Sequence, residues 1–167
     1  SRPEAAPAAG ILHGTRGTVV SQAPATTSGG DPHVVPPVEH VDVLIVGAGI
    51  SGIGGAHHIK EAFPDRSFLI VDALDSFGGT WWTHRYPGIR SDSDLFTFGY
   101  RFKPWKGSPI ATAEEILRYL GEVIEENDLD QYIRYQHRIT SATWSSADAQ
   151  WSVEVTRTDT GEQLRYT

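Results

Sequence analysis

The sequence predicts an α/β fold in which parallel strands are followed by an antiparallel β-meander. Two observations indicate this fold. A short apolar run rich in β-branched residues, 41–46, ends at a glycine-rich turn and passes into a segment with helical spacing. Near the end of the chain, three strand-like stretches alternate with turn residues, which is the pattern of antiparallel strands. The length of 167 residues suits one domain with a sizeable core.

Composition restricts the class of protein. Residues 1–40 are rich in Pro, Ala and Gly, and we expect a disordered leader because they hold few large apolar side chains. The leader lacks the apolar centre of a secretory signal, and no run approaches the ~20 apolar residues of a membrane helix, so we expect a cytoplasmic protein without membrane contact. A net charge of −7 without a basic patch argues against nucleic acid as a partner. The chain has no cysteine, which excludes disulfides and thiolate metal sites.

The turn after the first predicted strand carries the spacing Gly-x-Gly-x-x-Gly, which is typical of dinucleotide-binding βαβ units. Gly47 allows a tight turn, Gly49 lets the backbone approach a pyrophosphate, and Gly52 lets the helix lie against the strand. Ile50 and Ser51 lie between these glycines, at the helix start. The free amides and the positive dipole end of this helix would face the phosphates.

The second predicted strand spans residues 67–72, and its unpatterned apolar run indicates a parallel strand covered on both faces. It ends in Asp72, twenty residues after Gly52. An acid at this distance is placed to hydrogen-bond a ribose hydroxyl. The alternative is an ordinary βαβ turn with a solvated aspartate. Together with the glycine turn, this strand predicts a Rossmann-like domain.

The helix between these strands is predicted over residues 50–62. Gly54 and Gly55 lower its intrinsic stability, and we expect close packing on the sheet to offset this. His57 and His58 are adjacent and point roughly 100° apart, so they cannot share a metal as residues spaced i, i+4 do. We expect one of them to be packed and the other solvated, and we expect no metal site in the chain.

Residues 73–110 show little periodicity and many aromatic side chains, which favours either a wall for a ring-shaped ligand or a loop-rich core filled by large residues. These aromatic residues are Trp81, Trp82, Tyr86, Phe96, Phe98, Tyr100, Phe102 and Trp105. A capping box at Thr112–Glu115 opens a helix running to about residue 127. A strand over 132–135 follows, and the predicted meander occupies 139–145, 150–156 and 163–167.

The stretch from Gly78 to Asp92, with the sequence Gly-Gly-Thr-Trp-Trp-Thr-His-Arg-Tyr-Pro-Gly-Ile-Arg-Ser-Asp, resembles the class B flavoprotein monooxygenases of Baeyer–Villiger type. Within it, the element from Tyr86 to Asp92, Tyr-Pro-Gly-x-x-x-Asp, separates this type from sulfur- and nitrogen-oxidising relatives. The run continuing to Trp105 is most similar to the subgroup that contains the ethionamide-activating monooxygenase. The resemblance covers residues 41–167.

The resemblance implies that residues 41–167 form part of a Rossmann-like FAD-binding domain, with the NADPH domain and the last strands of the FAD domain absent. It implies FAD and NADPH as cofactors, O₂ as co-substrate, and a small-molecule ketone or sulfide as substrate. NADPH would reduce FAD, and a C4a-peroxyflavin would insert one oxygen into a ketone, giving an ester or lactone, or pass it to a sulfide. We expect the 167-residue chain alone to be inactive.

The resemblance also assigns residues to the cofactor. The FAD-binding positions carried over are Gly47, Gly49, Ile50, Ser51, Gly52, Asp72, Gly78, Gly79, Thr80, Trp81, Tyr86 and Asp92. The family more often has Glu where this chain has Asp72. In the family, the acid matching Asp92 partners an arginine that steadies negative charge on the oxygenated flavin, and the alternative for Asp92 is a turn residue that caps local amides. Two other functions stay open, namely a sulfur- or nitrogen-oxidising flavin-containing monooxygenase and a non-catalytic nucleotide-binding module.

Overall fold

The structure is a computed structural model, and it describes residues 36–167. Residues 1–35 of the expected leader lie outside the described residues. The last part of that expected leader belongs to the fold, because Val38–Glu39 form strand β1, which pairs in parallel with the last strand of the chain. Among residues 36–167, none of the helices combines the length and the apolar character needed to span a bilayer.

A parallel sheet carries the glycine turn. Its strand order is β2 (Val43–Val46), β3 (Phe68–Val71) and β4 (Ile133–Arg134), with β3 in the centre. Helix α1 (Ile50–Ala62) connects β2 to β3. All four residues of β3 are buried, which confirms the prediction of a strand covered on both faces.

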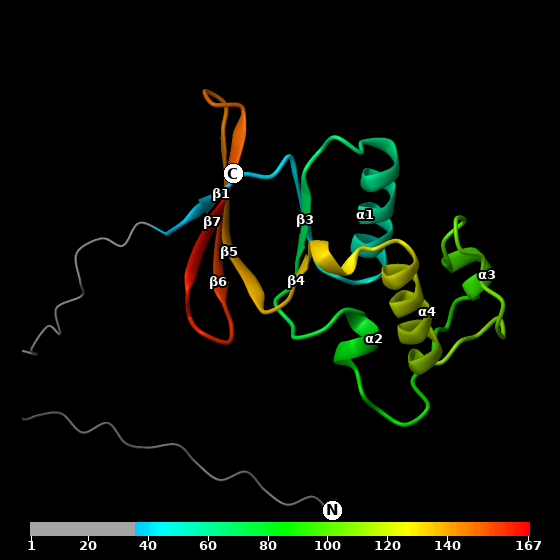
Figure 1. Cartoon of the computed structure of the whole chain (residues 1–167). Coiled ribbons are helices and arrows are strands. Elements are labelled where there is room, and N and C mark those ends of the chain that lie inside the picture. Colours follow the sequence, from blue (N-terminus) through cyan, green and yellow to red (C-terminus); the bar gives the residue numbers. More distant parts are fainter. Residues whose placement is uncertain (1–35) are drawn as a thin grey trace, which may run out of the picture. The chain divides into compact units, whose positions relative to one another are not determined.

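The predicted meander is confirmed as a second sheet. Strands β5 (His137–Ser145), β6 (Gln150–Arg157) and β7 (Gln163–Tyr166) pair antiparallel, and β1 extends the sheet beyond β7. Side chains from one face of β3 pack with buried residues of β6 and β7. Figure 1 shows this sheet on one side of β3, and α1 on the other side. Strand β3 therefore contributes to both cores.

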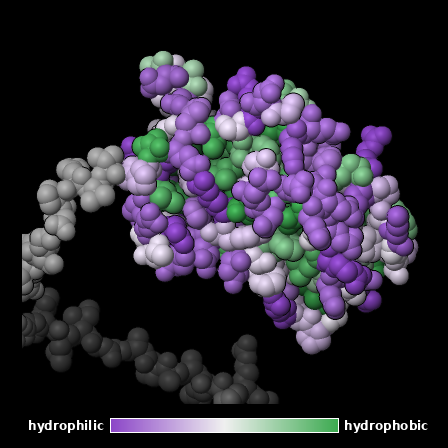
Figure 2. All heavy atoms as spheres, viewed as in Figure 1, coloured by the Kyte–Doolittle hydropathy of each residue, from purple (hydrophilic) through white to green (hydrophobic). Residues whose placement is uncertain are grey.

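Short helical segments and one long helix complete the described residues. They are α2 (Thr80–Thr83), α3 (Leu95–Phe98), α4 (Ala113–Glu126) and the 3₁₀ turn η1 (Asp130–Tyr132). The predicted capping box opens α4, because Thr112 Oγ1 accepts from the Glu115 amide at 3.3 Å and the Glu115 carboxylate accepts from the Thr112 amide at 2.8 Å. Apolar side chains of α4 pack in one core with those of α1 and β3. On the face shown in Figure 2 most side chains are hydrophilic, as expected for helices that turn their apolar sides inward.

The aromatic-rich segment does not form one wall. Tyr100 and Phe102 stack with ring centroids 4.7 Å apart, and Trp105 meets Tyr119 of α4 edge to face at 5.5 Å. These rings pack against the main core, as the loop-core alternative predicted, whereas Phe96 is exposed. A Cβ on Gly54 would lie 2.7 Å from Tyr100 Cε1. The prediction that this glycine packs on the sheet is therefore wrong, since it makes room for Tyr100.

Candidate functional site

The glycine turn has the backbone geometry that the sequence predicts. Gly47 has φ +95°, a conformation that L side chains rarely adopt. A Cβ on Gly52 would lie 1.9 Å from the carbonyl oxygen of Gly47, so only glycine lets α1 start this close to the turn. The structural roles predicted for these two glycines, in the turn and in the close helix contact, are confirmed.

The first turn of α1 presents free hydrogen-bond donors. Within residues 36–167, the amides of Ile50, Ser51 and Gly52 find no acceptor, and the N-cap residue Gly49 has no side chain to cap them. The first amide of the helix with a partner is that of Ile53, which donates to the Gly49 carbonyl at 3.0 Å. Three amides and the positive end of a 13-residue helix dipole therefore face one space. Such an arrangement binds phosphate groups.

That space is a cleft of about 380 Å³. One wall is the glycine turn with the first turn of α1, and the other wall is Gly78, Gly79, Thr80 and Trp81. The structure thus brings together nine of the predicted cofactor positions, in residues 47–52 and 78–81. Phe98 of α3 also lines the cleft, and sequence reasoning did not single it out for this role. Its place in the aromatic-rich segment was the only signal.

The two glycine-rich loops touch across the base of this cleft. The Gly78 amide donates to the Ala48 carbonyl at 2.9 Å. A Cβ on Gly79 would lie 3.4 Å from the Cα of Gly49, and a Cβ on Gly78 would lie 2.3 Å from Leu117 Cδ2 of α4. A side chain at Gly78 would therefore collide with α4, whereas Gly79 has room for a Cβ but adopts φ +53°, a conformation that L side chains rarely adopt.

Asp72 lies at the end of β3, next to the glycine turn. Its side chain is buried, its Oδ2 accepts from the Ala48 amide at 2.7 Å, and its Oδ1 accepts from the Leu74 amide at 2.8 Å. The carboxylate therefore ties the glycine turn to the end of the neighbouring strand. Sequence reasoning missed this role, although parallel neighbours end at the same sheet edge and so place Asp72 beside the turn. Asp72 does not line the cleft, and the ribose contact stays a prediction.

Tyr86 and Asp92 lie outside the cleft at the glycine turn. Tyr86 is exposed and lines a second cleft of about 480 Å³, which shares Trp81 with the first. Asp92 is exposed and lines neither cleft, and within the described residues its carboxylate accepts one hydrogen bond, from Ser93 Oγ at 3.4 Å. The structure therefore does not bring Asp92 together with the glycine turn.

The local capping role that was the alternative for Asp92 belongs to a different residue. Asp94 is the N-cap of α3, where its Oδ1 accepts from the Phe96 amide at 2.8 Å and its Oδ2 from Thr97 Oγ1 at 2.9 Å. These hydrogen bonds lower the pKa of Asp94. Within residues 36–167, the Asp92 carboxylate caps no backbone amide, and Ser93 Oγ is its one hydrogen-bond donor.

Two tyrosines support the first turn of α1 from the side of the aromatic core. The hydroxyl of Tyr100 donates to the Ile50 carbonyl, and Tyr119 Oη accepts from the Tyr100 amide at 2.8 Å. Burial raises the pKa of Tyr100 far above its usual value, so the phenol stays protonated and keeps donating. This contact fixes the helix turn whose amides face the cleft.

Comparison with known proteins agrees with this geometry. Residues 45–120 match the family described as NAD(P)-binding Rossmann-like domain. Over 130 residues the chain is 47% identical to the FAD-containing monooxygenase EthA of Mycolicibacterium smegmatis, in a match that covers 77% of this chain and 26% of that protein.

Solved structures give the same result. The cyclohexanone-bound structure of cyclohexanone monooxygenase matches with a TM-score of 0.66 and 30% identity, covering 78% of this chain and 26% of that one. The OTEMO complex with FAD and NADP matches with a TM-score of 0.64 and 31% identity, covering 75% and 24%. The predicted α/β Rossmann-like fold is confirmed.

The chain spans about a quarter of the length of the curated relatives it matches. The matched residues include both glycine-rich loops that form the cleft, and the identity of 47% extends well beyond these motifs. The chain is therefore homologous to the FAD-binding region of the class B flavoprotein monooxygenases.

Proposed function

We propose that this chain forms the FAD-binding part of a Baeyer–Villiger-type monooxygenase, which uses NADPH and O₂ to oxygenate ketones or sulfides. The observation that carries the proposal is the set of free amides at Ile50, Ser51 and Gly52, which open on a cleft with Gly79–Trp81 as its far wall. The relatives support it, since one is named as an FAD-containing monooxygenase, one contains FAD and NADP, and one contains cyclohexanone.

The residues at the cleft fit the diphosphate of a dinucleotide. The three free amides would donate to phosphate oxygens, and Gly49 would let those oxygens approach because it has no Cβ. The helix already holds these amides in place, so binding needs little reorganisation. Asp72 would accept from a ribose hydroxyl with the lone pairs that its two backbone contacts leave free. FAD supplies the redox chemistry when bound.

The far wall of the cleft would meet the cofactor beyond its diphosphate. Gly79, Thr80 and Trp81 line this wall, and Trp81 continues into the second cleft, where Tyr86 lies. We place Tyr86 and Asp92 on the substrate side, as the resemblance implies. There Asp92 would hold an arginine beside the reacting oxygen, and one well-placed charge in a site without water lowers a barrier by roughly 3 kcal/mol.

A titration of the purified chain with FAD tests the proposal, with Gly49→Ala as the matched variant. Gly49 has a φ of −81°, which any residue can adopt. A Cβ added there would have Gly79 Cα as its nearest neighbour, at 3.8 Å, so the variant should fold normally. Its methyl group would stand where the phosphate must approach. We expect wild-type chain to bind FAD and quench its fluorescence, and the variant to bind at least about tenfold more weakly.

The opposite result would favour the non-catalytic module. A chain that is folded by circular dichroism and still takes up no FAD contradicts the proposal. Product analysis of the complete monooxygenase with a cyclic ketone, NADPH and O₂ then distinguishes the chemistries, because a Baeyer–Villiger enzyme gives a lactone. Oxidation confined to sulfides and amines would instead favour the sulfur- or nitrogen-oxidising class.

A further inference from the structure

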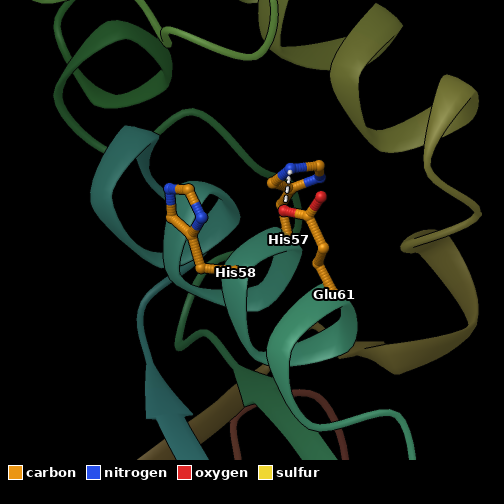
Figure 3. A group of neighbouring side chains, drawn as sticks. All are labelled: His57, His58 and Glu61. Carbon is orange, nitrogen blue, oxygen red and sulfur yellow. Dashed lines mark ion pairs between the residues drawn. The ribbon is translucent and has the colours of Figure 1, made fainter.

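Three potential metal ligands gather on the C-terminal half of α1, about two turns beyond the glycine turn. They are His57, His58 and Glu61, and one ligand atom of each lies within 4.8 Å of the others. Figure 3 shows the side chains of His57 and Glu61 pointing toward one another from successive turns, with the ring of His58 beside them. His57 Nε2 and Glu61 Oε2 are 3.5 Å apart. The sequence predicted no metal site because the two adjacent histidines diverge, but this prediction did not consider Glu61. The pair that shares a helix face is His57–Glu61, spaced i, i+4, and a ligand atom of His58 still lies within 4.8 Å of both.

The tautomer of His57 follows from its neighbours. Asn127 Nδ2 donates to the Val123 carbonyl at 2.8 Å, and because that carbonyl can only accept, the orientation of the Asn127 amide is fixed. Asn127 Oδ1 therefore faces His57 Nδ1, at 2.9 Å, as an acceptor. His57 Nδ1 must carry a proton to make this contact, and in the neutral ring the lone pair then lies on Nε2.

That lone pair has no donor. Among the described residues, His57 Nε2 is a buried atom without a hydrogen-bond partner, and a carboxylate oxygen of Glu61 lies close to it. Two electron-rich atoms 3.5 Å apart repel each other unless a positive species lies between them. The ring cannot turn away freely, since it stacks on Phe102 with centroids 3.6 Å apart.

We propose that His57 Nε2, Glu61 and His58 bind a divalent transition-metal ion, with Zn²⁺ as the best match. Imidazole and carboxylate ligands at normal Zn²⁺ bond lengths in a tetrahedral site lie about 3.4 Å apart, close to the 3.5 Å between His57 Nε2 and Glu61 Oε2. His58 is exposed, so its ring can rotate to complete the set, and water would take the fourth position. The Asn127 contact to Nδ1 is the kind of outer hydrogen bond that orients metal-bound histidine.

Calorimetric titration of the full chain with Zn²⁺ alone tests this site. We expect one ion bound at this cluster, and we expect Glu61→Gln and His58→Ala each to weaken that binding at least about tenfold, because each removes a ligand. Asp65→Asn is the matched control, since it removes the same charge from an exposed residue close to the end of the same helix. Its Zn²⁺ affinity should equal that of the wild-type chain.

Nitrogen NMR of the histidine rings identifies the ligand atoms in the same samples. Zn²⁺ should shift the Nε2 resonance of His57 and leave its Nδ1 protonated. The proposal is overturned if Zn²⁺ does not bind, or if Glu61→Gln binds it as the wild-type chain does. It is equally overturned if both nitrogens of His57 are protonated at neutral pH and do not respond to Zn²⁺, because a proton then lies where the metal should be.

Discussion

Two glycines of α1, three positions apart, have opposite surroundings. A Cβ on Gly52 would lie 1.9 Å from the Gly47 carbonyl oxygen, whereas a Cβ on Gly55 would meet nothing within 4 Å. We predict that Gly52→Ala destabilises the fold and abolishes FAD uptake, because the helix must move off the turn. Gly55→Ala should stabilise the fold by roughly 0.5–1 kcal/mol, since alanine is the better helix former. Urea unfolding and FAD titration of both variants measure this.

Each variant is the control for the other, because both carry the same Gly→Ala substitution in the same helix. If both variants lose the same stability, the close contact between Gly52 and the turn has no special importance. A Gly52→Ala variant that still binds FAD with wild-type affinity would contradict the geometry of the cleft.

The buried carboxylate of Asp72 gives a second prediction at this scale. Asp72→Asn places an amide NH₂ group where two backbone N–H donors, those of Ala48 and Leu74, need an acceptor. We expect a loss of about 1–3 kcal/mol in the free energy of unfolding, because one buried donor is left unpaired. Denaturant unfolding of the Asp72→Asn chain measures this loss, and Asp65→Asn, the same substitution at an exposed residue, is the control. Equal stability of the two variants would show that Asp72 does not hold the turn.

Single-residue roles could be predicted from the sequence where they depend on local rules. The steric needs of Gly47 and Gly52 follow from the spacing of their motif, and the structure confirms them. The contact from Asp72 to Ala48 depends on how β2 and β3 align, which no local pattern gives. The sequence also could not show whether Asp92 or Asp94 is the capping residue, because both lie in the same Ser-Asp-Ser-Asp run. The exact residue at which α3 begins decides that Asp94 is the cap.

At the scale of elements, hydrogen bonds from Asp42 form a polar clip that joins the N-terminal ends of the parallel strands β2 and β3. Asp42 precedes β2, and its carboxylate accepts from Ser67 Oγ at 2.7 Å, from the Ser67 amide at 2.8 Å and from Arg66 Nη1 at 2.9 Å. The hydrogen bonds from Ser67, followed by the contact with Arg66, lower the pKa of Asp42 to about 2.

This clip predicts how stability depends on acid. A carboxylate with a lowered pKa in the folded state stabilises the fold above its unfolded pKa of about 3.9. The contribution is lost as the pH falls toward the folded pKa of about 2. We predict that Asp42→Asn lowers the melting temperature at neutral pH and that its difference from wild type shrinks between about pH 4 and pH 2. A difference that stays constant across this range would show that the Asp42 charge is not involved.

Most elements could be predicted because their signals are local. Hydrophobic periodicity predicted α1, and periodicity together with the capping box predicted α4. The continuous apolar run at β3 predicted a strand that is buried on both faces. Strand β1 was missed, since a two-residue strand after two prolines has no pattern of its own and exists only by pairing with β7. The sequence did not decide whether the aromatic segment forms a ligand-binding wall or part of the core. The packing of Tyr100 depends on the space that Gly54 leaves in α1, a different element.

At the scale of the whole molecule, one central strand couples the two sheets. One face of β3 packs with the meander, and the other face packs with the core that holds α1 and α4, as the elements around β3 in Figure 1 indicate. The cleft opens at the carboxyl end of β2, where α1 begins. This is the position at which parallel α/β sheets bind dinucleotides.

The chain carries a single Gly-x-Gly-x-x-Gly motif, at residues 47–52. We predict that the 167-residue chain binds FAD and consumes no NADPH, because NADPH has no glycine turn of its own here. The absorbance of NADPH, followed with purified chain and added FAD in air, measures this. Steady consumption that requires FAD would contradict the prediction, and a sample without FAD is the control.

The most direct test is an amide NMR titration of the folded chain with FAD. If the free amides at the start of α1 bind the diphosphate, the largest shifts will fall on Ile50, Ser51 and Gly52, with smaller shifts in residues 78–81 across the cleft. Shifts that leave these three amides unchanged and gather elsewhere, or no shifts at all in a folded sample, would contradict the central claim.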